Sequence, residues 1–407
     1  MRNIVGSPVE GDDFFGREED VDWACRTLRD GNHLLLLAPR RVGKTSLAKR
    51  VGNRLQQEDW RFAWCDVQGA TNEMELLSRL LEGIREAGIE RGTWETIGAI
   101  LSAIPRAVKG KYEHSGLTVE IAAPDGSGPT TPLRLLENLL ERVTAGDERL
   151  VIGVDELPIF LAGLEKADRG PERVRAFLNS FRALRTRFHR QVRWFLLGSV
   201  GLDTFVEARK LVPTTNDLTA WNLGAFPEPT AIRFLQRLGD SYQMVVPEAA
   251  CRAVLAAVGW PLPFYLQIVF SRLHYRHSIQ PGPITEQAVA EAIQELETPA
   301  YWNYFESWRG RLGEGLDPDQ RLAARTILDA LSRDGKGRTR AALQALVVRT
   351  LPLRDPEETR ALLSTVLGQL ERDGYLLSHS AAPGGGTVRY AFRSFLLRRY
   401  WYMREVR

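Results

Sequence analysis

The sequence predicts an α/β fold, a doubly wound parallel sheet followed by a small helical domain and a C-terminal domain of helices and a hairpin. Apolar runs that suit buried strands alternate with helical patterns over the first half of the chain. After Pro227 the patterns become helical, and two short strand patterns close the chain. We expect four parts, at residues 1–226, 227–300, 301–318 and 319–407.

Composition narrows the class of protein. The chain has 407 residues, 44% of them apolar and 26% charged, which is typical of a globular protein with two or three domains. No run approaches the ~18 apolar residues of a membrane span, and the N-terminus lacks the apolar core of a signal peptide. Its three cysteines, Cys25, Cys65 and Cys251, are too far apart for metal spacing or a disulfide framework. We therefore expect a cytoplasmic protein that has no membrane partner.

The first strand pattern, at residues 33–37, leads into a candidate phosphate-binding loop. A helical pattern at residues 21–28 precedes the strand, and another helical pattern begins at Ser46. The segment between reads Ala38, Pro39, Arg40, Arg41, Val42, Gly43, Lys44, Thr45 and Ser46. Gly-Lys-Thr between a strand and a helix is typical of a loop whose backbone amides bind phosphate oxygens.

This loop predicts ATP and Mg²⁺ as ligands. Lys44 would reach the β- and γ-phosphates, and the Thr45 hydroxyl would bind Mg²⁺. We expect the residues from Pro39 to Ser46 to form the nucleotide site. Such loops normally begin with glycine, and here a small residue, Ala38, stands in that place. The alternative is an ordinary turn with an exposed lysine.

The segment before the first helix has two interpretations. It contains Phe15, Gly16 and Arg17, followed by three acidic residues. Segments in this position often pack against the adenine of the nucleotide. The other interpretation is a helix N-terminus whose acidic residues favour the helix dipole.

The next elements complete the first half of the sheet. We expect a strand at 61–67, an amphipathic helix at 73–84 and a further helix at 132–143. Residues 92–128 are less regular, with a hairpin around 117–121, and could form an insertion that contacts a partner.

An acidic pair ends the next predicted strand, at residues 149–156. The apolar run finishes in Asp155 and Glu156, and the carboxyl ends of parallel strands face the ligand crevice. Asp155 would hold Mg²⁺, and Glu156 would orient and deprotonate the attacking water. The alternative is a strand that ends at solvent with two acidic residues.

Two further strands complete the sheet. A helix at 171–189 leads to a buried strand at 192–199, and the last strand lies at 218–223. Ser199 would end its strand beside the acidic strand, where its hydroxyl could contact the γ-phosphate or the attacking water. A serine that merely ends a strand is the alternative.

The helical part after Pro227 resembles a lid. Helices are expected at 230–238, 247–258, 264–274 and 285–296, with a turn at 259–263 between the second and third. The aromatic-rich connector at 301–308 suits packing between domains better than base stacking.

The last part has the pattern of a winged helix. Helices are expected at 321–331, 339–347 and 357–372, followed by strands at 375–378 and 388–392. The third helix could enter a DNA groove, although its acidic start would repel phosphate. Packing or contact with a protein partner is the alternative use of this domain.

Positive charge is concentrated at the C-terminus. Residues 319–407 contain 16 Lys and Arg against 9 Asp and Glu. The strongest basic cluster consists of Arg393, Arg398, Arg399 and Arg404. An anionic partner such as double-stranded DNA would suit this cluster, and an arginine-rich solvated surface is the alternative.

Together these motifs resemble the P-loop ATPases of the AAA+ and STAND group, in particular the prokaryotic archaeal-type ATPases with an origin-recognition-like layout. The resemblance runs over nearly the whole chain and rests on the segments already named, at residues 15–18, 39–46, 154–156, 198–199, 259–263 and the C-terminal domain. It implies a Walker A role for Gly43, Lys44 and Thr45, a Walker B role for Asp155 and Glu156, and a sensor role for Ser199. It also implies that Pro261, in the Gly-x-Pro turn, couples the nucleotide to the lid.

One part implied by the resemblance is hard to place. Such ATPases often supply an arginine across a subunit interface, and Arg209 is the single arginine between residues 201 and 230. If Arg209 does not act in this way, hydrolysis is slow and the protein is a switch rather than a motor.

The sequence therefore predicts a Mg²⁺-dependent ATPase that couples ATP and ADP binding to a DNA or protein partner. One alternative is a DNA-binding regulator or loader whose ATP site controls assembly, with nucleotide-dependent homo-oligomers. The other is a scaffold in which the nucleotide is structural and is not hydrolysed.

Overall fold

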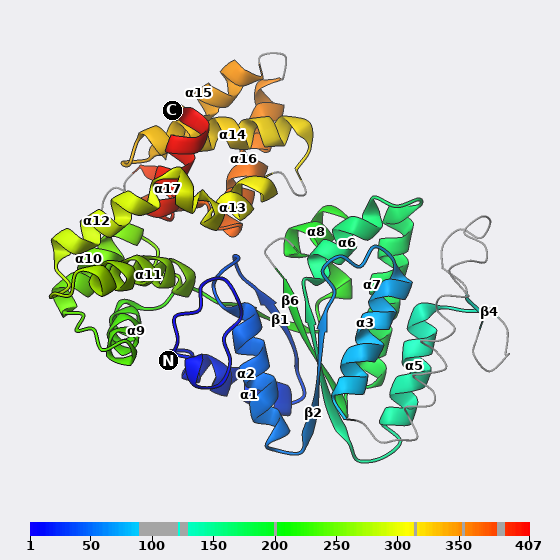
Figure 1. The fold of residues 1–407 in the computed structure, drawn as a ribbon. Coiled ribbons are helices and arrows are strands. Elements are labelled where there is room, and N and C mark those ends of the chain that lie inside the picture. Colours follow the sequence, from blue (N-terminus) through cyan, green and yellow to red (C-terminus); the bar gives the residue numbers. More distant parts are fainter. Residues whose placement is uncertain (89–120, 123–128, 199–201, 313–315, 352–354, 381–386) are drawn as a thin grey trace. The chain divides into compact units, whose positions relative to one another are not determined.

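The computed structural model describes residues 1–88, 121–122, 129–198, 202–312, 316–351, 355–380 and 387–407 (Figure 1). The chain divides into two compact units. The unit that we call the sheet unit comprises Arg17–Ala38 and Lys44–Leu223. The unit that we call the helical unit comprises Met1–Gly16, Pro39–Gly43 and Gly224–Arg407. The candidate phosphate-binding loop thus has residues in both units.

A parallel sheet of five strands forms the centre of the sheet unit, in the order β2-β5-β6-β1-β7. The strands are β1 (His33–Leu37), β2 (Trp60–Asp66), β5 (Arg149–Asp155), β6 (Val192–Gly198) and β7 (Leu218–Asn222). All five predicted strands are present. Parallel strands buried on both faces read as continuous apolar runs, which is why the sequence shows them clearly.

Helices cover both faces of this sheet, as a doubly wound fold requires (Figure 1). Alternate strand residues point to opposite faces, and Leu35 and Leu37 of β1 belong to the buried cluster on the face covered by α3, α5 and α7. Leu34 and Leu36 are fully buried on the other face, which α1 and α2 cover. The helices and 3-10 turn of the sheet unit are α1 (Glu18–Arg29), α2 (Lys44–Gln56), α3 (Glu73–Glu86), α5 (Pro132–Val143), α6 (Leu157–Glu165), α7 (Gly170–Arg187), α8 (Leu202–Ala208) and η2 (Val212–Thr214).

The sequence patterns do not predict α6 or α8. Helix α6 follows β5 directly, and no turn pattern in the sequence separates the two. A single residue, Glu156, changes the chain direction through its left-handed backbone (φ 60°). Of the expected hairpin around 117–121, two residues of β3 (Ile121–Ala122) pair antiparallel with β4 (Pro129–Thr130). The rest of that prediction lies outside the described residues.

After the sheet, the helical unit continues with the four predicted helices. They are α9 (Glu228–Ser241), α10 (Glu248–Val258), α11 (Pro263–Ile279) and α12 (Glu286–Leu296). Gly259 ends α10 with a left-handed backbone (φ 71°), a conformation that glycine adopts at little cost. Because Pro261 and Pro263 follow, the chain turns at the position that the sequence predicts.

The aromatic connector packs against its neighbours, as predicted. It contains η3 (Pro299–Tyr304) and α13 (Glu306–Arg311). Phe305 is 1% exposed and stacks with both Tyr265 and Tyr400. Trp308 is also buried and contacts Trp260 edge-on. These rings therefore contribute to the core of the helical unit.

The C-terminal part contains the predicted helices and hairpin. Its elements are α14 (Pro318–Arg333), β8 (Arg338–Thr339), α15 (Arg340–Thr350), α16 (Pro356–Arg372), β9 (Leu376–Ser380), β10 (Val388–Phe392), α17 (Phe395–Trp401) and the π-helical turn η4 (Tyr402–Val406). The strands form an antiparallel sheet in the order β8-β10-β9, so β8 adds a short strand to the predicted hairpin. The glycine-rich tip at 383–386 lies outside the described residues. Throughout the described part of the chain, every helix is too short or too polar to span a lipid bilayer.

Candidate nucleotide-binding site

The candidate phosphate-binding loop connects β1 to α2, as the sequence predicts. Gly43, the last residue before α2, has a left-handed backbone (φ 98°) that glycine tolerates and other residues avoid. A Cβ atom at this position would meet no atom of the described residues within 4 Å, so these residues leave the backbone open on that side. Close approach of a phosphate to the loop backbone requires this kind of opening.

Lys44 is held inside the sheet unit by the start of its own loop. Its Nζ donates a hydrogen bond of 2.8 Å to the backbone carbonyl of Ala38, and the residue is 7% exposed. The contact uses only the backbone of Ala38, which alanine supplies as well as glycine does. Lys44 is therefore not the exposed lysine that the alternative expected.

Thr45 and Asp155 meet at the carboxyl edge of the sheet. The hydroxyl of Thr45 donates a 2.7 Å hydrogen bond to Oδ2 of Asp155, and the backbone N–H of Glu156 donates to Oδ1 at 3.0 Å. The side-chain contact joins the first turn of α2 to the end of β5. Asp155 is 7% exposed, so this strand does not end at solvent.

Burial raises the pKa of Asp155, and the negative charges of Glu156 and Asp66 raise it further. The hydrogen bond from Thr45 and the charge of Lys44 act in the opposite direction. A cation bound beside Asp155 would compensate for the cost of burying its charge. The fold therefore leaves the negative charge of Asp155 costly to bury.

Asp66 is a residue that the sequence patterns did not single out. It ends β2 and lies directly opposite Asp155 in the β2–β5 register. Its Oδ1 accepts a hydrogen bond of 2.8 Å from the backbone N–H of Gln68. The sequence does show a second apolar strand that ends in aspartate. This pattern indicates a place beside Asp155 only once β2 and β5 are known to be neighbours.

Glu156 is placed by backbone geometry rather than by a side-chain cap. Its φ of 60° lies in the left-handed region, which costs a non-glycine residue about 1 kcal/mol or more. The residue caps α6, which packs closely on β6: a Cβ at Gly198 would lie 2.4 Å from Cγ of Pro158. A strained residue at the end of a buried strand suits a functional role for Glu156.

Ser199 lies outside the described residues. The strand that ends just before it, β6, pairs with β1 on one side and β5 on the other, so β6 runs beside the acidic strand.

Arg209 is engaged within its own unit. Its guanidinium forms an ion pair with Glu165 at the end of α6 and lies 3.8 Å from the ring centre of Phe205. Its Nη1 also donates to the backbone carbonyl of Phe205 at 2.9 Å. This arginine would have to leave Glu165 before it could act on another subunit.

Arg41, a loop residue that belongs to the helical unit, contacts two other segments of that unit. Arg41 has a left-handed backbone (φ 68°), donates a 2.7 Å hydrogen bond to the carbonyl of Gly6, and lies 4.5 Å from the ring centre of Phe264 in α11. Burial and the nearby charge of Arg40 lower the pKa of Arg41. Of the remaining loop residues, Val42 (1% exposed) and Ser46 (7% exposed) are buried, and Pro39 and Arg40 are partly buried.

The segment before α1 divides at the boundary between the units. In the helical unit, Phe15 packs on Phe234, and a Cβ at Gly16 would lie 2.6 Å from Thr230. In the sheet unit, Arg17 is 8% exposed and pairs with Asp20, and burial lowers its pKa.

Pro261 lies in the turn between α10 and α11. Its carbonyl accepts a 3.1 Å hydrogen bond from the backbone N–H of Phe226. Contact of these residues with a nucleotide stays a prediction.

The oxygen donors present fit a magnesium ion. Thr45 and Asp155 supply a hydroxyl and a carboxylate, and Asp66 supplies a second carboxylate nearby. Magnesium bound with a nucleotide takes one or two protein oxygens, phosphates and water rather than a full cage of protein ligands. In the described part of the chain, no group of three or more His, Cys, Asp or Glu that could hold a metal occurs.

Comparison with solved structures identifies a protein of the same architecture. A Walker-type ATPase of Pyrococcus abyssi superposes with a TM-score of 0.60 at 15% identity, over 98% of this chain and 99% of that one. The ORC2 protein of Aeropyrum pernix, solved in ADPNP–ADP complexes, gives a TM-score of 0.48 at 13% identity, over 96% of this chain and 93% of that one. No protein-family model matches the sequence, and no curated protein matches it either. The chain therefore shares the fold of an archaeal Walker-type P-loop ATPase over nearly its whole length, which confirms the predicted resemblance at the level of the fold.

Proposed function

We propose that this protein binds ATP with Mg²⁺, hydrolyses it, and acts as a molecular switch. The observation that carries the proposal is the 2.7 Å hydrogen bond between Thr45 and Asp155. The buried Lys44 precedes Thr45 at the start of α2. A hydroxyl, a buried carboxylate with a raised pKa and a lysine are the groups that P-loop ATPases use for Mg²⁺ and phosphate. Their assembly from distant segments supports a nucleotide site.

Each residue has a role that follows from its position. Thr45 and Asp155 would hold Mg²⁺, which when bound neutralises phosphate charge. Lys44 would leave the carbonyl of Ala38 and donate to the β- and γ-phosphates. Glu156 would accept the proton of the attacking water, with Ser199 orienting that water.

The helical unit suggests how a bound nucleotide would be sensed. We propose a core at 1–226, a lid at 227–300, a linker at 301–318 and a winged helix at 319–407. Arg41 of the loop contacts Phe264 of α11, and a Cβ at Gly374, after α16, would lie 3.1 Å from Pro39 of the loop. Phosphates that reposition this loop would therefore move residues that contact both the lid and the C-terminal domain.

Phosphate release by purified protein tests the proposal. Wild type should release phosphate from ATP when Mg²⁺ is present, and both Lys44→Ala and Glu156→Gln should release at least about a hundredfold less. Glu172→Gln, which removes an exposed carboxylate from α7, is the matched control and should behave as wild type. Equal release by Glu156→Gln and the control would show that Glu156 is not the base.

A second candidate function is a DNA-binding regulator or loader whose ATP site controls assembly. The excess of positive charge after residue 319 favours it, and the engagement of Arg209 by Glu165 favours slow turnover. Size measurement with and without ATP and double-stranded DNA separates the candidates. A species that grows only with both ligands supports a loader, and a monomer throughout, with no turnover, supports a scaffold that binds nucleotide or a protein partner.

A further inference from the structure

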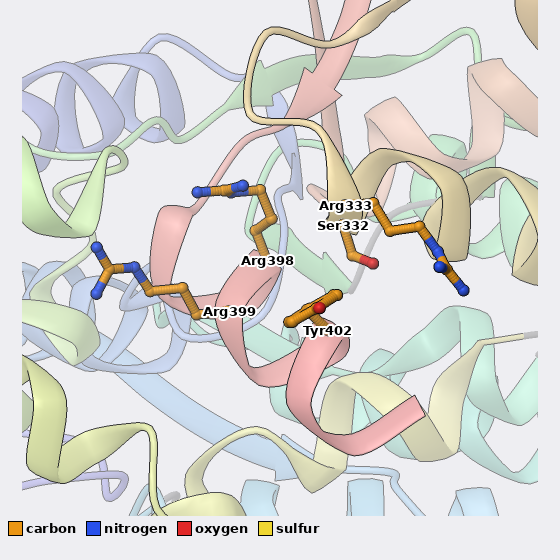
Figure 2. A pocket seen from close by; sticks show the side chains of 5 residues that line it. All are labelled: Ser332, Arg333, Arg398, Arg399 and Tyr402. Atoms are coloured by element: carbon orange, nitrogen blue, oxygen red, sulfur yellow. The ribbon is translucent and has the colours of Figure 1, made fainter. Parts of the chain in front are cut away.

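A basic hollow lies in the C-terminal part of the helical unit, among residues that the nucleotide site does not use. It has a volume of about 360 Å³ and is lined by Ser332, Arg333, Arg398, Arg399 and Tyr402 (Figure 2). These residues come from the end of α14, from α17 and from η4. We propose that this hollow, the arginine pocket, binds the phosphate group of a ligand.

The charge of the lining favours an anion. Three of its five residues are arginines, and none is a carboxylate. In Figure 2 the guanidinium groups of Arg398 and Arg399 lie on one side of Tyr402 and that of Arg333 lies on the other. The side chains of Arg333 and Arg399 extend away from Tyr402 in opposite directions, so positive charge surrounds the hollow rather than converging on one point. Arginine is the residue best suited to phosphate.

In the part of the chain that the structure describes, the nearby Asp329 forms no ion pair with the lining of the hollow. Its carboxylate accepts a 2.8 Å hydrogen bond from the indole N–H of Trp401, and its backbone carbonyl accepts from the hydroxyl of Ser332. The first contact fixes α17 against α14, and the second lies within α14. They give the pocket a built wall, since Ser332 and Trp401 are both buried.

Arg398 provides the strongest indication of a ligand. Its Nε is buried and has no hydrogen-bond partner among the described residues. The guanidinium lies close to the turn after α14, where a Cβ at Gly335 would be 3.2 Å from its Nη1. A buried donor without an acceptor is costly, and a phosphate oxygen in the pocket would supply one.

Arg399 links the pocket to the helix that precedes the aromatic connector. It forms an ion pair with Glu297, the residue that caps α12, and the two side chains are 41% and 28% exposed. A phosphate would compete with Glu297 for this guanidinium. Binding at the arginine pocket would thus loosen the tie between α17 and α12.

The size of the hollow and the ring of Tyr402 suit an organic phosphate. Pockets for small organic ligands begin at about 300 Å³, and Tyr402, which is 38% exposed, offers a ring for stacking. The phosphate could belong to a small molecule or to a nucleic-acid backbone. Both present the same oxygens to the arginines, so the two sources are arms of one experiment.

The experiment uses the full chain carrying Lys44→Ala, so that the candidate nucleotide site does not contribute. Binding of inorganic pyrophosphate is measured by calorimetry, and binding of a short DNA duplex by fluorescence anisotropy. Arg398→Gln and Arg399→Gln remove pocket charges, and Arg349→Gln, exposed on α15, is the control of equal charge. Circular dichroism verifies that all variants are folded.

We expect pyrophosphate to bind, and each pocket variant to bind at least about tenfold more weakly than the control. A parallel loss for the duplex assigns the phosphate to a nucleic acid, and loss for pyrophosphate alone assigns it to a small ligand. If neither pyrophosphate nor the duplex binds, the proposal is overturned. Equal binding by Arg398→Gln and Arg349→Gln would also overturn it. If the wild-type protein does not hydrolyse ATP, the result of this experiment still holds, because every protein in it carries Lys44→Ala.

Discussion

The hydroxyl of Thr45 donates a 2.7 Å hydrogen bond to the carboxylate of Asp155, a residue 110 positions further along the chain. The contact pairs the first turn of α2 with the last residue of β5. It forms although burial makes the charge on Asp155 costly and raises its pKa. The cost of burying this charge lowers the stability of the ligand-free protein, as the proposed nucleotide site would require.

Replacing Asp155 with asparagine should therefore stabilise the ligand-free protein. Because the pKa of Asp155 is raised in the folded state, its carboxylate holds a proton more readily in the folded protein than in the unfolded chain at pH values above 3.8, the ordinary pKa. The contribution of Asp155 to stability therefore falls as the pH rises from 3.8 through the raised pKa. At pH 7 Asp155→Asn should gain about 1 kcal/mol in the free energy of unfolding, and the gain should shrink in acid.

Chemical denaturation at several pH values measures this difference. Asp168→Asn, at an exposed position after α6, is the control and should change little. A loss of stability in Asp155→Asn at pH 7 would contradict the interpretation of Asp155 as a strained carboxylate.

Lys44 should be required for stabilisation by ATP. A ligand at about a hundred times its Kd stabilises the folded state by about 2.7 kcal/mol. This gain should be absent in Lys44→Ala, because the ammonium group held at Ala38 is the group that would reach the phosphates. Thermal unfolding with and without ATP and Mg²⁺ measures the gain. Lys166→Ala, after α6, should keep it, and an unchanged gain in Lys44→Ala would remove the lysine from the site.

The sequence predicted the strands of the sheet well because burial on both faces leaves continuous apolar runs, as in β5 and β6. It predicted Lys44, Thr45 and Asp155 because their residue types and local context are specific. It could not reveal Asp66, whose place beside Asp155 depends on the register of β2 against β5. Nor could it reveal the pairing of Arg209 with Glu165, which joins two separate elements.

Helix boundaries were less predictable than helix cores. The apolar pattern of α14 predicts a start at residue 321, and the helix begins at Pro318. A capping box between Asp317 and Gln320 sets that start, and neither side chain contributes to the apolar pattern. Strand β8 was missed for a related reason, since its two residues are too few for any period.

Protonation of His33 should destabilise the sheet in mild acid. His33 begins β1, is 5% exposed, and its Nδ1 accepts a 3.2 Å hydrogen bond from the backbone N–H of Trp194. Burial, assisted by the charge of Arg185, lowers its pKa from 6.5 to about 4. The unfolded chain therefore binds the proton more readily, and stability is lost as pH falls from 6.5 towards 4.

The loss should amount to about 3 kcal/mol, since each unit of pKa shift corresponds to about 1.4 kcal/mol. Denaturation between pH 7 and pH 4 would show it in wild type. His33→Asn, which does not titrate, should have a flatter profile, whereas His189→Asn, at an exposed position after α7, should follow wild type. A wild-type slope in His33→Asn would assign the acid sensitivity to other groups.

Gly374, in the turn between α16 and β9, should not tolerate alanine. Its backbone is left-handed (φ 84°), and a Cβ there would lie 2.8 Å from Cη2 of Trp260 and 3.1 Å from Cβ of Pro39. Trp260 cannot retreat easily, because Arg393 lies 4.5 Å from the centre of its ring and Trp308 packs against it edge-on. Backbone strain and steric conflict therefore act together, and Gly374→Ala should lower the free energy of unfolding by about 2 kcal/mol or more.

Gly368→Ala is the matched control, since it makes the same change inside α16. A Cβ at residue 368 would meet only the flexible end of Arg372, at 3.2 Å, and alanine favours a helix by up to about 1 kcal/mol over glycine. The two substitutions should thus have opposite signs in chemical denaturation of the full chain. Equal effects would mean that the turn at Gly374 is not packed against Trp260 and Pro39. Opposite effects, with weaker ATP binding in Gly374→Ala alone, would support mechanical coupling between this turn and the phosphate-binding loop.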